Sequence, residues 1–172
     1  MLHGDRVVLR PLTDDDVEPL WRGKLDPLTW ARTSDQPLLP TPLARARARS
    51  AERADDVDAH FAVEAGGVLA GQALLFRVDT LARSAELGLW LLAEHRGQGL
   101  GRDVVRVLVD YGFRSRNLRR LSLRTLASNV PALAVYRALG FVEEGRQREG
   151  AWVEGAYDDL VLMALLRSDP RP

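Results

Sequence analysis

A glycine-rich run at residues 96–101 has the residue types and the spacing of a backbone anion site. Its sequence is Arg-Gly-Gln-Gly-Leu-Gly, with glycine at Gly97, Gly99 and Gly101. Glycine tolerates a positive φ and lets the backbone approach a ligand closely. Where a helix begins at the end of such a run, its first N–H groups and the positive end of its dipole face the same ligand. The run therefore predicts a site for phosphate groups.

The segments on either side have the patterns needed to position this run. Residues 87–92 are apolar except for Gly88 and predict the end of a strand. The following segment predicts a helix over 101–116, because apolar side chains recur there at helical spacing. They are Val104, Val105, Leu108, Val109 and Phe113. A strand, a tight turn and a helix start are thus expected in direct succession.

Two common nucleotide sites do not fit the run. A P-loop needs a lysine and a hydroxyl residue after its last glycine, but Arg102 follows Gly101 and the chain's only lysine is Lys24. A dinucleotide fingerprint needs a third glycine at the position of Arg102. It also needs an acidic residue about 20 residues further on, where this chain has residues 118–123, without an acid. Both nucleotide folds are disfavoured.

The rest of the chain predicts a single α+β domain over residues 1–172, with a mostly antiparallel sheet. Expected strands are 6–10, 60–65, 68–78, 84–92, 121–126, 141–148 and 159–166, and expected helices begin at Thr13, 43, 101 and Asn129. Four prolines in 26–42 predict an irregular segment that carries Trp30, a candidate for a mobile substrate-side loop. The element order is β-α-α-β-β-β-α-β-α-β-β.

Composition limits the other classes of function. Acidic and basic residues balance at 24 each, so no overall field recruits nucleic acid or a membrane surface. With no cysteine and three scattered histidines, neither a metal site nor a cysteine nucleophile is expected. No apolar signal region opens the chain and no apolar run reaches membrane-spanning length, so a cytoplasmic protein is expected.

Two clusters of arginine stand out against this balanced background. One comprises Arg45, Arg47, Arg49 and Arg53, and the other comprises Arg114, Arg116, Arg119 and Arg120. Solvated helix faces are the favoured interpretation of both. A contact between the second cluster and a phosphate tail is the alternative.

Two motifs together resemble the GCN5-related N-acetyltransferase (GNAT) family, over nearly the whole chain. The first is Arg-x-x-Gly-x-Gly, at Arg96, Gly99 and Gly101. The second is Asn129-x-x-Ala132-x-x-x-Tyr136-x-x-x-Gly140-Phe141, separated from the first by a helix and a strand. Residues 6–12 and 156–160 are similar to the subgroup that acetylates the N-termini of ribosomal proteins. The resemblance implies the GNAT fold and acetyl-CoA as cosubstrate.

The resemblance assigns the contacts with acetyl-CoA to main-chain groups of two adjoining stretches. Amides of the glycine turn would hold the pyrophosphate, and the strand before it would pair with the pantetheine arm. The turn residues are Arg96, Gly97, Gln98, Gly99, Leu100, Gly101 and Arg102, and the strand residues are Leu89, Trp90 and Leu91. The Leu91 amide would also stabilise the oxyanion of the tetrahedral intermediate. Trp90 is equally well explained as a core residue.

Two further residues receive roles by the same route, and a third is chosen from its place on the strand. Asn129 would contact the pantetheine arm, although a helix cap explains it equally well. Tyr136 would be the general acid that protonates the departing thiolate, with helix–sheet packing as its alternative role. Glu86 is the first choice for the base, because strand alternation places it on one face with Gly88 and Trp90. An exposed glutamate at a strand start is the alternative, and Glu149 and Asp158 are reserve candidates.

These assignments predict an N-acetyltransferase that moves an acetyl group directly from acetyl-CoA to a primary amine. The acceptor is a protein N-terminus or a small molecule, and Ala132 departs from the serine common in relatives that act on ribosomal proteins. A catalytically silent acyl-CoA-binding sensor or scaffold is the alternative, and a structural dimer is a third class. Formation of a homodimer by the enzyme is left open.

Overall fold

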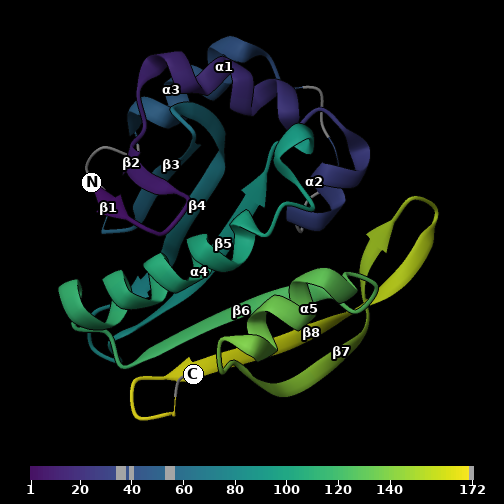
Figure 1. Ribbon diagram of the computed structural model, residues 1–172. Helices are drawn as coiled ribbons and strands as arrows, with labels where there is room; N and C mark the ends of the chain where they lie inside the picture. Colours follow the sequence, from purple (N-terminus) through teal and green to yellow (C-terminus); the bar gives the residue numbers. More distant parts are fainter. Residues whose placement is uncertain (34–37, 39–40, 53–56, 171–172) are drawn as a thin grey trace.

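A mixed sheet of eight strands forms the centre of the computed structural model, which describes residues 1–33, 38, 41–52 and 57–170. The strand order is β1-β2-β3-β4-β5-β6-β8-β7 (Figure 1). The strands are β1 (Leu2–His3), β2 (Val8–Pro11), β3 (Ala59–Ala65), β4 (Val68–Asp79), β5 (Ser84–Leu91), β6 (Arg120–Leu126), β7 (Val142–Val153) and β8 (Ala156–Leu166). The helices are α1 (Asp14–Gly23), α2 (Pro27–Thr33), α3 (Leu43–Glu52), α4 (Leu100–Asp110) and α5 (Val130–Ala138), with short turns η2 (Ala93–His95) and η3 (Tyr111–Ser115).

Neighbouring strands are antiparallel except for β5 and β6, which are parallel. A parallel pair needs a crossover, and here α4 supplies it between the two strands. The predicted α+β class and mostly antiparallel sheet are confirmed. The one parallel junction divides the sheet into an N-terminal half and a C-terminal half.

Helices cover both faces of the sheet. Helices α4 and α5 lie on the face shown toward the viewer in Figure 1 and contribute Val104, Leu108 and Leu133 to the main core. Helix α1 lies against the other face, where its Leu20 packs on Trp90 in a smaller cluster. Because successive strand residues point to opposite faces, Leu87 and Trp90 of β5 belong to these two separate clusters.

One helix lies where the four prolines predicted an irregular segment, so that prediction is wrong for residues 27–33. Proline is tolerated in the first helical turn, and α2 begins at Pro27. The carboxylate of Asp26 caps the helix by accepting hydrogen bonds from the Thr29 N–H at 2.8 Å and the Thr29 hydroxyl at 2.6 Å. The rest of the expected loop includes residues 34–37 and 39–40, which lie outside the described part.

The other differences concern the ends of elements. The C-terminal strands run further than predicted and form a long hairpin whose turn is Glu154 and Gly155, both with positive φ. Such a two-residue turn matches the twist of the strands, but glutamate is an unusual residue in it. The short strand β1 was also missed. The predicted helix over 101–116 divides into α4 and the wider turn η3.

The described residues contain no helix long and apolar enough to cross a membrane. Nor do the described residues hold a group of three or more histidine or carboxylate side chains arranged to bind a metal ion.

Candidate active site

The parallel strands β5 and β6 separate part of the way along their length. Their pairing runs from Ser84–Arg120 to Glu86–Ser122, but β5 continues to Leu91 and β6 to Leu126. Over the same stretch β6 stays paired with β8, and β5 stays paired with β4. The sheet therefore opens between residues 87–91 and 123–126, and this opening leads to the glycine turn.

Backbone alternation decides which β5 amides face this opening. The Leu92 N–H donates to the carbonyl oxygen of Ala70, 2.9 Å away, and so points toward β4. Because strand residues alternate in the direction of their N–H and C=O groups, those of Leu89 and Leu91 point toward β6. These are two of the three strand residues predicted to meet the pantetheine arm. The third, Trp90, has its side chain on the face of the sheet covered by α1.

The glycine turn follows β5 and η2 and has the geometry that the spacing predicted. Gly97 and Gly99 have φ values of 71° and 78°, which favour glycine, and Gly99 is the N-cap of α4. Residues 97–99 are exposed, whereas Leu100 is buried in the core and anchors the helix start. The first N–H groups of α4 thus lie next to this exposed turn, with the helix dipole directed at the same point, and the N–H of Arg102 also donates to the Gly99 carbonyl oxygen at 3.3 Å.

Arg96 points away from this turn. Its Nε donates to the Leu91 carbonyl oxygen at 2.9 Å, and a terminal nitrogen donates to Thr29 Oγ at 2.7 Å. Thr29 is buried and is itself bonded to Asp26. The guanidinium therefore joins the end of β5 to the start of α2. Sequence reasoning missed Thr29, and only its position three residues after Asp26 could have indicated the cap.

Trp90 and Glu86 lie on the β5 face opposite α4. Trp90 is buried, donates from Nε1 to Gln72 at 3.3 Å, and has the Lys24 ammonium 5.1 Å from its ring centre. The Glu86 carboxylate is half-buried and accepts a hydrogen bond from Arg77 at 2.8 Å through Oε1. Its Oε2 lies 3.8 Å from Arg124 Nε, beyond hydrogen-bond length. Each carboxylate oxygen thus faces an arginine, Oε1 in a hydrogen-bonded ion pair and Oε2 in a longer one.

Tyr136 lies on α5 and packs against Phe141, with ring centres 5.7 Å apart. Its residue is only 9% exposed, and no hydrogen bond to its hydroxyl occurs among the described residues. Burial raises the pKa of Tyr136 to about 12, because desolvation penalises the phenolate. The side chain therefore remains a protonated donor across the physiological pH range.

Asn129 and Asp158 lie together where β6 leads into α5. Asn129 is the N-cap residue of α5, but its side chain makes no capping hydrogen bond. Asp158 instead accepts from the neighbouring Ser128, at 2.6 Å from Oγ and 3.3 Å from the backbone nitrogen. The structure thus leaves the Asn129 amide uncommitted, whereas one oxygen of the reserve base Asp158 is engaged in holding the loop.

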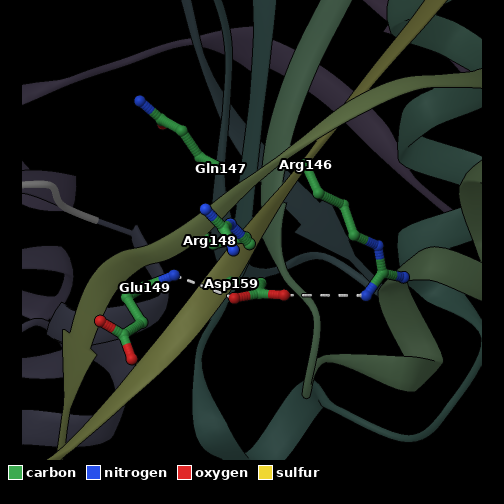
Figure 2. A pocket seen from close by; sticks show the side chains of 5 residues that line it. All are labelled: Arg146, Gln147, Arg148, Glu149 and Asp159. Atoms are coloured by element: carbon green, nitrogen blue, oxygen red, sulfur yellow. Dashed lines mark hydrogen bonds and ion pairs between the residues drawn. The ribbon is translucent and has the colours of Figure 1, made fainter.

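The second reserve base, Glu149, lines a separate hollow on the C-terminal hairpin. Figure 2 shows this solvent-open space of about 700 Å³, bordered by Arg146, Gln147, Arg148, Glu149 and Asp159. Its Asp159 accepts from the Glu149 backbone nitrogen at 2.9 Å and lies 4.0 Å from Arg146. Two arginines and two acids balance one another there. The hollow belongs to β7 and β8, and neither strand carries the glycine turn.

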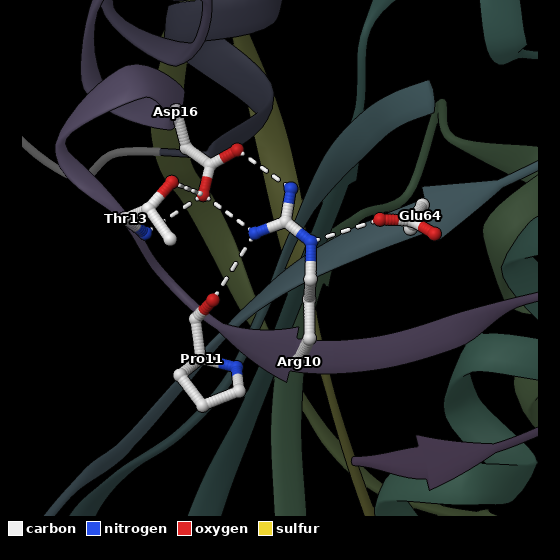
Figure 3. A network of polar contacts seen from close by, with 5 residues as sticks. All are labelled: Arg10, Pro11, Thr13, Asp16 and Glu64. Carbon is white, nitrogen blue, oxygen red and sulfur yellow. Dashed lines mark hydrogen bonds and ion pairs between the residues drawn. The ribbon is translucent and has the colours of Figure 1, made fainter. Parts of the chain in front are cut away.

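A polar network that sequence reasoning missed fixes the start of α1. In Figure 3 the Arg10 guanidinium binds both oxygens of Asp16, at 2.7 and 2.8 Å, and donates to Glu64 at 2.9 Å. Asp16 also accepts from the Thr13 backbone and hydroxyl at 2.8 and 2.9 Å. Burial alone would raise the pKa of Asp16, but these hydrogen bonds lower it overall. The network holds α1, and with it Leu20, against the Trp90 face.

Comparison with known proteins agrees with this geometry. The family described as "Acetyltransferase (GNAT) domain" matches residues 6–142. The chain is 34% identical to the spermidine N(1)-acetyltransferase of Vibrio cholerae over 115 residues, which are 66% of each protein. It is 32% identical to the ribosomal-protein-serine acetyltransferase of Escherichia coli over 88 residues, 51% of this chain and 49% of that protein. The chain thus spans about half to two thirds of the length of these relatives.

Solved structures match over almost the full length. The crystal structure of the Vibrio cholerae spermidine N-acetyltransferase in complex with CoA and spermine has a TM-score of 0.88 and 26% identity, covering 95% of this chain and 96% of that one. A dodecameric structure of the same enzyme has a TM-score of 0.83 and 25% identity, covering 95% of each chain. The family match, the open parallel junction and the glycine turn agree, and the chain belongs to the GNAT acetyltransferase family.

Proposed function

We propose that this protein is an N-acetyltransferase that transfers an acetyl group from acetyl-CoA directly to a primary amine. The observation that carries the proposal is the opening between β5 and β6, which ends at the glycine turn of residues 97–102, exposed at residues 97–99. An extended thioester-bearing arm fits beside the free edge of β5, with its phosphates at the N-terminus of α4. The family membership and the named relatives support the same reaction.

The acyl-transfer step uses groups on both sides of the opening. The amine attacks the thioester carbonyl and forms a tetrahedral intermediate, whose oxyanion accepts a hydrogen bond from the Leu91 N–H. Collapse of the intermediate breaks the carbon–sulfur bond, and the former amine nitrogen releases its extra proton to solvent to give the neutral amide. The departing thiolate takes a proton from the Tyr136 hydroxyl, and the phenolate regains a proton from solvent.

The acceptor must first lose a proton, because an alkyl ammonium has no lone pair with which to attack. We assign this step to Glu86, directly or through a water molecule. Its position on the Trp90 face supports the assignment, and its two oxygens face Arg77 at 2.8 Å and Arg124 at 3.8 Å. Glu86→Gln is therefore expected to lower kcat more than Glu149→Gln or Asp158→Asn does.

A panel of amines with free-thiol detection tests the proposed reaction. Spermidine, spermine and a short peptide with a free N-terminus are the first acceptors, because one named relative is a spermidine acetyltransferase with a structure containing spermine and another is a ribosomal-protein-serine acetyltransferase. Thiol release that depends on both acetyl-CoA and an amine supports the enzyme. Tight CoA binding without thiol release for any amine supports the silent binding module instead. Absence of CoA binding in a thermal-shift measurement contradicts both and favours a structural role.

A homo-oligomer is also part of this proposal, supported by the dodecameric Vibrio cholerae relative. Light scattering coupled to size-exclusion chromatography measures the mass of the particle. A mass above the 19.1 kDa of one chain supports self-association, and a single-chain mass contradicts it.

A further inference from the structure

The turn between β1 and β2 lies directly on the first turn of α4. The Asp103 carboxylate of α4 accepts hydrogen bonds from the backbone nitrogens of Arg6 at 2.7 Å and Val7 at 3.1 Å. Gly4 fits so closely that a Cβ added there would lie 2.5 Å from the same carboxylate. Burial would raise the pKa of Asp103, but the Arg6 backbone and Arg106 hydrogen bonds lower it overall. The anchored carboxylate thus fixes the position of Arg6.

From this position the Arg6 side chain reaches the glycine turn, more than ninety residues away in the sequence. One of its terminal nitrogens donates to the Gln98 carbonyl oxygen at 2.5 Å. The same nitrogen would lie 3.6 Å from a Cβ placed on Gly99. Arg6 is an exposed residue, and its guanidinium has no carboxylate partner in the described part of the chain. Its other N–H donors remain available beside the exposed amides of the turn.

The arginine of the glycine motif does not occupy this place. Arg96 uses its guanidinium on Leu91 and Thr29, in the junction between β5 and α2. Arg114 and Arg116 of the second basic cluster lie beyond the C-terminal end of α4, at the opposite end of the helix from the turn. Of these arginines, Arg6 alone donates to the turn itself.

We propose that Arg6 is a phosphate-binding residue of the acetyl-CoA site, where its guanidinium clamps the pyrophosphate against the amides of residues 97–102. The inference rests on the proposed function, because it assumes that CoA occupies the turn. A guanidinium suits this role, since its planar fork of donors matches two phosphate oxygens at once. The Gln98 contact orients the fork and uses only one of its five N–H groups.

The test compares ligands with and without the pyrophosphate. Arg6→Gln keeps a donor for the Gln98 carbonyl but removes the charge, and Arg114→Gln is the matched control at an exposed arginine. The dissociation constants of CoA and dephospho-CoA are measured by calorimetry. Arg6→Gln is expected to weaken both by about tenfold or more, since both carry the pyrophosphate. Arg114→Gln is expected to stay within about twofold of the wild type.

A donor that lacks the pyrophosphate separates binding from a structural role. The KM of S-acetylpantetheine is expected to be the same for Arg6→Gln and the wild type. An equal rise in KM for S-acetylpantetheine and acetyl-CoA means that Arg6 only supports the turn, and overturns the proposal. Unchanged CoA affinity in Arg6→Gln also overturns it. If Arg6→Gln weakens the binding of CoA but not that of dephospho-CoA, Arg6 contacts the 3′-phosphate and the pyrophosphate clamp is overturned.

Two further results complete the test. If Arg6→Gln fails to fold, Arg6→Lys replaces it, because a lysine keeps the charge but lacks the planar fork of donors. Weaker CoA binding by Arg6→Lys, with an unchanged KM for S-acetylpantetheine, supports the proposal. Equal CoA affinity of Arg6→Lys and the wild type overturns the clamp. A wild-type protein that does not bind CoA contradicts the proposed function itself. A wild type that binds CoA with no effect of Arg6 contradicts this inference alone.

Discussion

The Arg96 guanidinium donates from Nε to the carbonyl oxygen of Leu91, 2.9 Å away and five residues earlier in the chain. The bond closes the loop between β5 and the glycine turn, and a second bond from Arg96 joins that loop to Thr29 of α2. Arg96 thus holds the end of β5 in place beside the opening between β5 and β6. Its direct contact with the cofactor stays a prediction from family resemblance.

Arg96→Lys tests this positioning role. A lysine ammonium can replace one of the two bonds but not both, so the free energy of unfolding is expected to fall by about 1–3 kcal/mol. Urea denaturation measures the change. Arg22→Lys is the control, because Arg22 is exposed and its ion pair with Glu18 is expected to contribute less than about 1 kcal/mol. Equal effects of the two substitutions would argue against the role.

Tyr136→Phe is expected to remove the general acid and to lower kcat by about 10²- to 10⁴-fold, with little change in CoA affinity. Initial rates and calorimetry measure the two quantities. Tyr157→Phe is the matched control, because Tyr157 is 65% exposed on the C-terminal hairpin. A Tyr136→Phe enzyme with wild-type kcat would exclude the tyrosine as the acid.

The raised pKa of Tyr136 gives a second, independent expectation. A tyrosine with a pKa of about 12 stays protonated at pH values where an ordinary tyrosine, with a pKa of 10.0, has lost its proton. It is therefore expected to cause no loss of kcat on the alkaline side up to about pH 11. The pH profile of kcat checks this directly. A decline centred near pH 10 that disappears in Tyr136→Phe would mean that the hydroxyl has an ordinary pKa and is better solvated than the structure indicates.

The glycine turn allows a comparison of two glycines that differ in backbone conformation. Gly99→Ala places a Cβ on a residue with a φ of 78°, which is expected to cost about 1–2 kcal/mol of stability. Gly101 lies inside α4, and a Cβ there would meet only Leu89 at an ordinary 3.7 Å. Gly101→Ala is therefore expected to stabilise the protein by up to about 1 kcal/mol. Denaturation curves in which Gly101→Ala is less stable than Gly99→Ala would contradict this turn conformation.

The Arg10–Asp16 pair makes a prediction about stability and pH. Asp16→Asn leaves the Arg10 guanidinium without its bidentate partner, and a loss of about 3 kcal/mol is expected. Asp15→Asn is the control at an exposed residue of the same helical turn, where less than about 1 kcal/mol is expected.

The sign of the pH dependence follows from the lowered pKa of Asp16. A carboxylate with a lowered pKa stabilises the folded state above its unfolded-state pKa, and this contribution disappears as the pH falls through the folded-state pKa. The difference in unfolding free energy between wild type and Asp16→Asn is therefore expected to be constant near neutral pH and to shrink only below the ordinary aspartate pKa of 3.8. A difference that shrinks between pH 5 and 7 would contradict the assignment.

Local patterns were sufficient to predict much of the site. The glycine spacing at 97–101 predicted the turn, and Gly99 has the positive φ that makes glycine necessary there. The Thr13 helix start and the strand at 121–126 also follow from spacing over a few residues, and the structure contains both. These features depend on neighbours in the sequence, so the sequence contains the information directly.

Apart from α2, the features that could not be predicted depend on tertiary contacts. The prolines of 26–42 concealed α2, because the same residue type begins a helix at Pro27 and interrupts one elsewhere. The direction of Arg96 depends on Thr29, and the approach of Arg6 to Gln98 depends on Asp103. Each pairing joins residues about seventy or more positions apart. No short-range spacing indicates such a contact.

Hydrogen exchange on adding CoA tests the central claim most directly, because it locates the ligand on the chain. If the opening between β5 and β6 receives CoA, the amides of Leu89, Leu91 and residues 97–102 exchange more slowly in the complex. The amides of β1 to β3 stay unchanged, except near Arg6. Protection confined to the hairpin hollow at residues 146–149, with the glycine turn unaffected, would contradict the account.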